Sequence, residues 1–217
     1  IPDDNIFLKY FRSNGNNPIF KRSEILGEIS KQSKCIAVAG THGKTTTSAI
    51  ISHLFYSSGI HFKAFIGGIM KCFDSNYLNT GNDYIIVEAD EYDRSFLNLN
   101  VNYAVITSIE NDHLDVYGDF KSLTESFQSF ANNVKDVLIT DAEIKLDKDF
   151  SFSIKNDSDY YLNNIDILEH EIRFDLKTPN NFYSNISANI IGLHNLKNVL
   201  AALSIIDQIK EIDIQNL

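Results

Sequence analysis

Short apolar runs alternate with helical patterns through the first two thirds of the chain. Four runs have the apolar character of buried parallel strands, and they cover residues 35–39, 84–87, 103–107 and 136–140. Apolar stripes at helical spacing follow two of these runs, and Asp119 is placed to cap one of the helices. Strands that alternate with helices pair in parallel through right-handed crossovers. The pattern therefore predicts an α/β fold, with a mostly parallel sheet flanked by helices.

The pattern changes at about residue 150. Segments 150–154, 165–176 and 182–190 alternate apolar and polar positions and are separated by polar breaks. This alternation predicts a small antiparallel β appendage packed beside the main sheet. An apolar stripe then predicts a closing helix over residues 195–210. Before the first buried run, residues 22–32 have a short helical pattern with Ser23 as a candidate cap.

Composition narrows the class of protein. The 217 residues are 43% hydrophobic and 22% charged, which is globular and excludes wholesale disorder. A net charge of −10 argues against bulk nucleic-acid binding, which needs a basic surface. Two cysteines are too few for a disulfide framework, and no apolar stretch approaches the ~20 residues that cross a bilayer. We therefore expect a cytoplasmic protein with neither nucleic-acid nor membrane partners.

A glycine- and threonine-rich segment lies between the first apolar run and the following helix. Backbone N–H groups at a helix N-terminus bind anions, and glycines let the backbone approach phosphate oxygens. A lysine such as Lys44 neutralises charge on β- and γ-phosphates, and a hydroxyl such as that of Thr45 reaches Mg²⁺. The predicted nucleotide-binding residues are Gly40, Thr41, His42, Gly43, Lys44, Thr45 and Thr46.

This segment departs from the full phosphate-loop pattern, because Val38 stands where the first glycine would fall. The alternative interpretation is a tight turn with a chance lysine. The strand before and the helix after the segment favour the phosphate site. The sequence does not indicate a role for His42.

Acidic residues follow the second apolar run directly. In an open parallel sheet, ligands bind at the carboxyl ends of the strands, where Glu88 lies. Carboxylates gathered beside a phosphate loop favour Mg²⁺, which prefers oxygen ligands. We therefore expect Glu88 to be a metal ligand, and we interpret Asp90, Glu91 and Asp93 as a solvated acidic loop.

His113 follows the third apolar run, in the segment Glu-Asn-Asp-His-Leu-Asp. Its place at the same sheet edge as Lys44 and Glu88 makes it a candidate metal ligand or polar contact. An ordinary surface histidine is the alternative.

Two amides open the last helix. Asn195 is a natural N-cap, and Asn198 lies three residues later on the same side. Capping alone would explain Asn195. Together the two amides offer donors and acceptors that suit an adenine edge.

Four segments of the chain together resemble the Mur ligases of bacterial peptidoglycan synthesis. They are Gly-Thr-His-Gly-Lys-Thr-Thr from Gly40, Glu-Ala-Asp-Glu from Glu88, Asp-His-Leu-Asp from Asp112 and Gly-Leu-His-Asn-Leu-Lys-Asn from Gly192. Several related ligases carry a carbamylated lysine fourteen residues after the motif histidine. Phe127 stands at that position here, so the chain is most similar to the alanine-adding branch.

The resemblance implies an ATP-dependent ligase that joins L-alanine to UDP-N-acetylmuramate. It implies that Lys44 holds the β- and γ-phosphates of ATP, and that Thr45, Glu88 and His113 bind Mg²⁺. Lys44, Glu88 and His113 would serve catalysis, with Asn195 and Asn198 near the adenine.

The resemblance also implies a division into domains. Residues 1–34 match the end of a truncated N-terminal domain and its linker, and residues 35–217 match a central ATP-binding domain. The N- and C-terminal domains of the same protein would then be missing, in keeping with a chain that starts at Ile1. Other hypotheses are another Mur-type ligase, an ordinary phosphate-loop kinase or ATPase, and a nucleotide-binding interaction module without catalysis.

Overall fold

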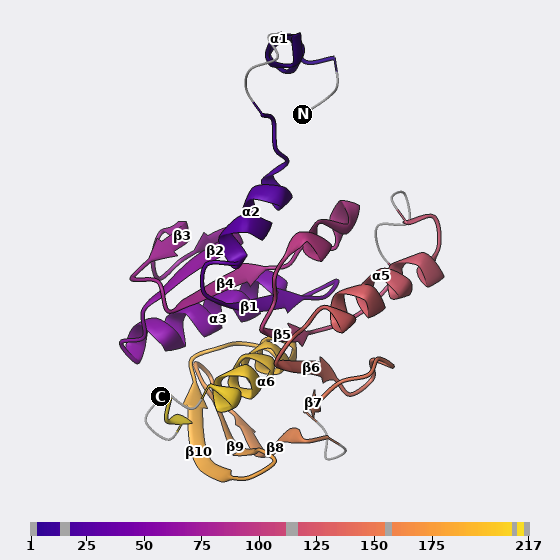
Figure 1. Cartoon of the computed structure of the whole chain (residues 1–217). Helices are drawn as coiled ribbons and strands as arrows, with labels where there is room; N and C mark the ends of the chain where they lie inside the picture. The colour runs from indigo at the N-terminus through magenta and orange to yellow at the C-terminus, as the bar shows by residue number, and fades with distance from the viewer. Residues whose placement is uncertain (1–3, 14–17, 112–116, 155–157, 210–211, 215–217) are drawn as a thin grey trace.

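The computed structural model describes residues 4–13, 18–111, 117–154, 158–209 and 212–214. Its strands form one sheet with helices on both faces (Figure 1). The order across the sheet is β10-β9-β8-β7-β6-β5-β1-β4-β2-β3. The strands of the described part of the chain are β1 (Lys34–Ala39), β2 (Phe62–Met70), β3 (Ser75–Asn79), β4 (Tyr84–Glu88), β5 (Tyr103–Ile106), β6 (Val137–Asp141), β7 (Phe150–Ser153), β8 (Tyr160–Ile167), β9 (Ile172–Lys177) and β10 (Phe182–Ala188).

The pairing confirms the predicted fold class. Strands β2, β4, β1, β5, β6, β7 and β8 pair with one another in parallel. Antiparallel pairing is confined to the two ends, where β3 adds to β2 and where β9 and β10 continue from β8. The antiparallel strands therefore extend the edge of the same sheet.

The expectation of an antiparallel strand at 150–154 is wrong. Strand β7 pairs in parallel with both β6 and β8. The connection before it buries Ile144 and Leu146 against one face of the sheet, so the chain crosses over instead of turning back as a hairpin. The hairpin of β2 and β3 was not predicted from the sequence.

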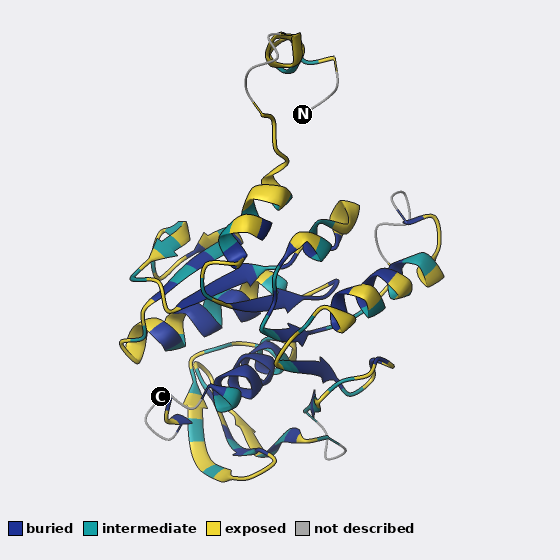
Figure 2. Ribbon diagram, in the orientation of Figure 1, coloured by how far each residue is buried: buried dark blue, intermediate teal, exposed yellow. Residues whose placement is uncertain are grey.

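Alternating side chains of the central strand serve two separate cores. Ile36 and Val38 of β1 point into one core, and Cys35 and Ala37 point into the other. Helices α3 (Lys44–Ser57) and α6 (Leu193–Gln208) cover the first core. Elements η1 (Tyr92–Asn98) and α5 (Phe120–Asn132) cover the second. The central strands are consequently buried on both sides (Figure 2).

Two helices precede the sheet. Helix α1 (Ile6–Ser13) buries no residue and stands away from the other elements (Figure 1). Helix α2 (Arg22–Ser30) packs on η1. The cap of α2 is Lys21 instead of the expected Ser23, because the Glu24 carboxylate accepts from the Lys21 amide at 2.6 Å.

Three further features concern the cap of α5, the cysteines and the character of the helices. Asp119 does cap α5, accepting from the Ser122 amide at 2.7 Å. Cys35 is a buried free thiol and Cys72 an exposed one. Among the described residues, no helix has both the length and the apolar character needed to cross a membrane.

Candidate functional site

The site lies where three neighbouring parallel strands end. Strand β1 is flanked by β4 and β5, and the chain passes to opposite sides of β1 when it forms these two partners. Such a reversal leaves a crevice at the carboxyl ends of the strands. Gly40 follows β1, Glu88 ends β4 and Thr107 follows β5, so three distant segments meet at this edge.

The loop after β1 requires glycine at two positions. Gly40 and Gly43 have φ of 131° and 83°, values that L side chains rarely adopt. A Cβ at Gly40 would also collide with the Thr107 hydroxyl. Helix α3 begins at Lys44, directly after Gly43. The amides of its first turn lack intrahelical acceptors, and they therefore form an anion-binding end next to the glycines.

Contacts with the end of β5 hold this loop in place. The Thr107 hydroxyl donates to the Ala39 carbonyl at 3.1 Å and also to the His42 carbonyl. Ser108 accepts from the Thr41 amide, and the Thr41 hydroxyl accepts in turn from the Glu110 amide at 2.9 Å. Thr107 was not predicted as a site residue, although its place at the end of the apolar run 103–107 was an available signal.

Lys44 is anchored from several sides. Its Nζ donates to the Gly40 carbonyl at 2.7 Å and contacts both carboxylate oxygens of Glu91 at 2.9 and 2.8 Å. The Glu91 side chain is 1% exposed. The interpretation of Glu91 as part of a solvated loop is therefore wrong, although the neighbouring Asp90 and Asp93 are exposed as expected.

Burial governs the electrostatics of this pair. Burial raises the pKa of Glu91, and the Lys44 ammonium offsets part of that effect. Removing one partner from a buried ion pair costs roughly 3–5 kcal/mol, whereas a single hydrogen bond from a charged group to a carbonyl contributes roughly 1.5–3 kcal/mol. The Glu91 contact is thus the strongest of those that hold Lys44.

Oxygen ligands gather beside Lys44. The Thr45 hydroxyl donates to Glu88 Oε1 at 2.9 Å, and the Gly67 amide donates to Glu88 Oε2 at 2.7 Å. Gly67 and Gly68 leave this space open: an added Cβ would lie 3.0 Å from the Glu88 carboxylate and 2.9 Å from the Thr45 methyl group, respectively. Oxygen donors at the edge of a phosphate loop suit Mg²⁺.

The third predicted metal ligand, His113, lies outside the described residues. Across the described ranges, no group of three or more His, Cys, Asp or Glu side chains is arranged to hold a metal ion. Thr45 and Glu88 are therefore the two predicted ligands that the structure brings together.

The two amides at the start of α6 have different surroundings. Asn198 is buried, and its Oδ1 lies so close to Gly43 that a Cβ there would collide with it. Asn195 donates its side-chain amide to the Ile191 carbonyl at 2.8 Å. Asn195 is not the N-cap, since Gly192 holds that position. The structure thus brings Asn198 to the phosphate loop, with Asn195 one helical turn away.

His42 and Thr46 lie at the solvent side of the loop and are exposed. The His42 Nε2 atom lies 3.6 Å from a Glu110 carboxylate oxygen, and both side chains are more than 60% exposed (66% and 63%). Such an exposed pair contributes little to stability.

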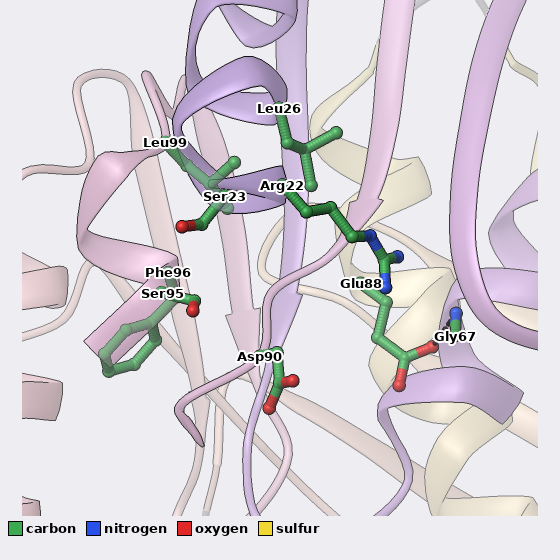
Figure 3. A pocket seen from close by; sticks show the side chains of 9 residues that line it. All are labelled: Arg22, Ser23, Leu26, Gly67, Glu88, Asp90, Ser95, Phe96 and Leu99. Carbon is green, nitrogen blue, oxygen red and sulfur yellow. Dashed lines mark hydrogen bonds between the residues drawn. The ribbon is translucent and has the colours of Figure 1, made fainter. Parts of the chain in front are cut away.

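A cavity of about 140 Å³ opens between α2, β4 and η1. Figure 3 shows the Arg22 side chain reaching from α2 toward Glu88. Asp90 lines the same cavity, and Phe96 and Leu99 supply apolar wall. Positive and negative groups therefore face a shared space beside the Thr45–Glu88 pair.

Comparison with known proteins finds a family match and similar sequences for this chain. Residues 38–206 match the family described as "Mur ligase middle domain". The chain is 42% identical over 209 residues to a UDP-N-acetylmuramate–L-alanine ligase of Christiangramia forsetii, covering 94% of this chain and 45% of that protein. It is 45% identical over 186 residues to the enzyme of the same name from Flavobacterium psychrophilum, covering 85% of this chain and 41% of that protein.

A solved structure has the same fold. The UDP-N-acetylmuramate–alanine ligase MurC of Thermotoga maritima superposes with a TM-score of 0.86 at 28% identity. The match covers 97% of this chain and 50% of that chain. The chain thus spans about half the length of the curated relatives that it matches.

Proposed function

Because the chain belongs to the Mur ligase family through its middle domain, we propose that it is the ATP- and Mg²⁺-binding part of a carboxylate–amine ligase. The proposed substrates of the whole protein are UDP-N-acetylmuramate and L-alanine, the pair in the names of its relatives. One observation carries the proposal: Lys44, held at the Gly40 carbonyl, and the hydrogen-bonded pair Thr45 and Glu88 lie together where β1 and β4 end.

Each loop residue has a proposed role. Gly40, Gly43 and the first-turn amides of α3 cradle the phosphates, while Lys44 neutralises their charge. Asn198, which packs against Gly43, and Asn195 lie near the adenine. Thr41 contributes to the nucleotide-binding segment through its main chain. His42 and Thr46 complete the segment on its solvent side.

Thr45 and Glu88 are the proposed Mg²⁺ ligands, together with His113. Mg²⁺ bound there supplies positive charge that offsets charge on the transferring phosphoryl group. The two glycines opposite, Gly67 and Gly68, support this assignment because they keep side chains out of that space.

The proposed reaction is phosphoryl transfer followed by acyl transfer. The substrate carboxylate attacks the γ-phosphorus of ATP, and ADP leaves. The alanine amine then attacks the carbonyl carbon of the acyl phosphate, phosphate leaves, and the nitrogen loses its proton. Such chemistry depends on alignment and charge neutralisation, and no protein nucleophile is required. The cavity beside Glu88 provides room for the carboxylate, with Arg22 as a counter-charge.

The domain division follows the same proposal. Residues 1–34 are the end of a preceding domain and its linker, and residues 35–217 are the central ATP-binding domain. The freestanding α1, which buries no residue, supports this division.

Hydroxylamine trapping tests the proposed function. Full-length protein containing this chain, incubated with Mg-ATP, UDP-N-acetylmuramate and hydroxylamine, is expected to yield a muramoyl hydroxamate without alanine. A kinase, an ATPase or a binding module would yield none, and that result would overturn the proposal.

A further inference from the structure

The Lys44–Glu91 ion pair lies at the base of the phosphate loop. The Lys44 side chain is 13% exposed and that of Glu91 is 1% exposed. Both carboxylate oxygens contact Nζ, and the Gly40 carbonyl lies at 2.7 Å on another side, with the Thr41 carbonyl at 3.4 Å. The ammonium therefore faces a carboxylate and two main-chain carbonyls.

Glu91 occupies a fixed position. Its carbonyl accepts from the Arg94 amide at 2.9 Å and from the Tyr117 hydroxyl, which ties the segment after β4 to a residue that precedes α5. Ala89, between Glu88 and Glu91, is fully buried in the second core. The carboxylate is consequently presented to Lys44 by a backbone that is held on both sides.

The number of N–H donors on the Lys44 ammonium determines which of its present contacts a phosphate can replace. An ammonium group has three N–H donors, and the present contacts occupy them. A nucleotide phosphate must therefore displace a contact. Giving up the Gly40 or Thr41 carbonyl costs one hydrogen bond, and this is cheaper than removing the ammonium from a buried carboxylate.

We infer that Glu91 is a positioning residue, which stays bound to Lys44 while phosphate oxygens replace the carbonyl contacts. Glu91 would then aim the ammonium at the phosphates without touching the nucleotide. This inference rests on the proposed function, since it assumes that the loop binds a nucleotide.

A double-mutant cycle on ATP affinity tests the inference in the full-length protein. Glu91→Gln is expected to weaken ATP binding about tenfold, measured by calorimetry. In the Lys44→Met background, Glu91→Gln is expected to change ATP affinity by less than roughly twofold, because Glu91 would act on the phosphates only through the Lys44 ammonium, which this variant lacks. An equal loss in both backgrounds would indicate a structural role and overturn the inference, as would unchanged or tighter binding by Glu91→Gln alone.

Asp93→Asn is the matched control. Asp93 also accepts from a lysine, Lys21, at 3.0 Å, but both side chains are more than half exposed (60% and 71%). The same loss of charge there is expected to leave ATP affinity within roughly twofold of the wild type.

A second measurement covers the case in which Lys44→Met does not fold. Adenosine has no phosphate, so Glu91→Gln is expected to leave adenosine binding unchanged while ATP binding weakens. A parallel loss of both would overturn the inference. If the wild-type protein binds no ATP, the proposed function itself fails; if it binds ATP and Glu91→Gln binds equally well, only the present inference fails.

Discussion

At the scale of single residues, the environment of Lys44 links stability to the site. Its ammonium faces the buried carboxylate of Glu91, and several contacts converge on one nitrogen atom. The same side chain thus supports the fold around the loop and, in the proposed function, also supplies charge to the nucleotide phosphates. Substitutions at Lys44 should accordingly have two separable effects, one on stability and one on activity.

Lys44→Ala is expected to destabilise the fold in a pH-dependent way. Burial raises the pKa of Glu91, and loss of the ammonium raises it further. A carboxyl group with a raised folded-state pKa favours folding below its unfolded pKa, near 4.5, and loses that contribution as the pH rises through the folded value. The loss in free energy of unfolding should therefore be about 3 kcal/mol near pH 8 and smaller near pH 5, as measured by urea denaturation.

Lys21→Ala provides the comparison for this prediction. Its partner Asp93 is exposed and solvent screens the pair, so the expected loss in free energy of unfolding is much smaller than that of Lys44→Ala at either pH. Equal losses in the two variants would contradict the account of Lys44.

Arg22→Ala is expected to raise the KM for the carboxylate substrate about tenfold, because it removes the positive charge that lines the cavity beside Glu88. The KM for ATP should change little. Steady-state kinetics on the full-length protein make the measurement, and Lys21→Ala, one residue away with the same change in charge, is the control. A matching rise in both variants would mean that only net charge matters.

At the scale of elements, the cap of α5 offers a test of local structure. The backbone N–H of Ser122 lowers the pKa of Asp119 below 3.8. A depressed folded-state pKa stabilises the fold above the unfolded pKa, and that stabilisation is lost as the pH falls through the folded value. The gap in Tm between the wild type and Asp119→Ala should therefore narrow below about pH 4.

Asp119→Asn separates charge from capping in this prediction. Asn retains an acceptor oxygen, so its gap in Tm to the wild type should be small near pH 7. A gap for Asp119→Ala that stays constant from neutral to acidic pH would argue against the charged cap.

The phosphate loop and its flanking elements could be predicted because strand, glycines, lysine and helix follow one another in the sequence. Capping of α5 by Asp119 was equally local. The hairpin of β2 and β3 was missed, because apolar and polar residues alternate less regularly in it than in the segments that were predicted as strands. Segment 150–154 was assigned the wrong direction because pairing direction depends on the path of the connection, which alternation does not encode.

Glu91 was missed for a different reason. An acidic residue in an acidic run is most often solvated, and its burial here depends on Lys44, 47 positions earlier in the chain. The N-cap assigned to Asn195 failed because Gly192 takes that position with φ of 90°. His113 remains a prediction, since it lies outside the described residues.

At the scale of the whole molecule, the parallel sheet gathers the ends of β1, β4 and β5 into one edge. The chain spans about half the length of its curated relatives, so this edge is one part of the proposed active site. We therefore expect these 217 residues alone to form no amide bond from UDP-N-acetylmuramate and L-alanine. Robust ATP- and alanine-dependent product from the isolated chain, detected by mass spectrometry, would contradict this expectation.

Phosphate release by the full-length protein tests the central claim most directly. With Mg-ATP, we expect sustained release only when UDP-N-acetylmuramate and L-alanine are both present, and a loss of at least about 100-fold in folded Lys44→Ala protein. Release that is independent of both substrates, or near-normal turnover by that variant, would contradict the assignment of this sheet edge as the ATP site of a ligase.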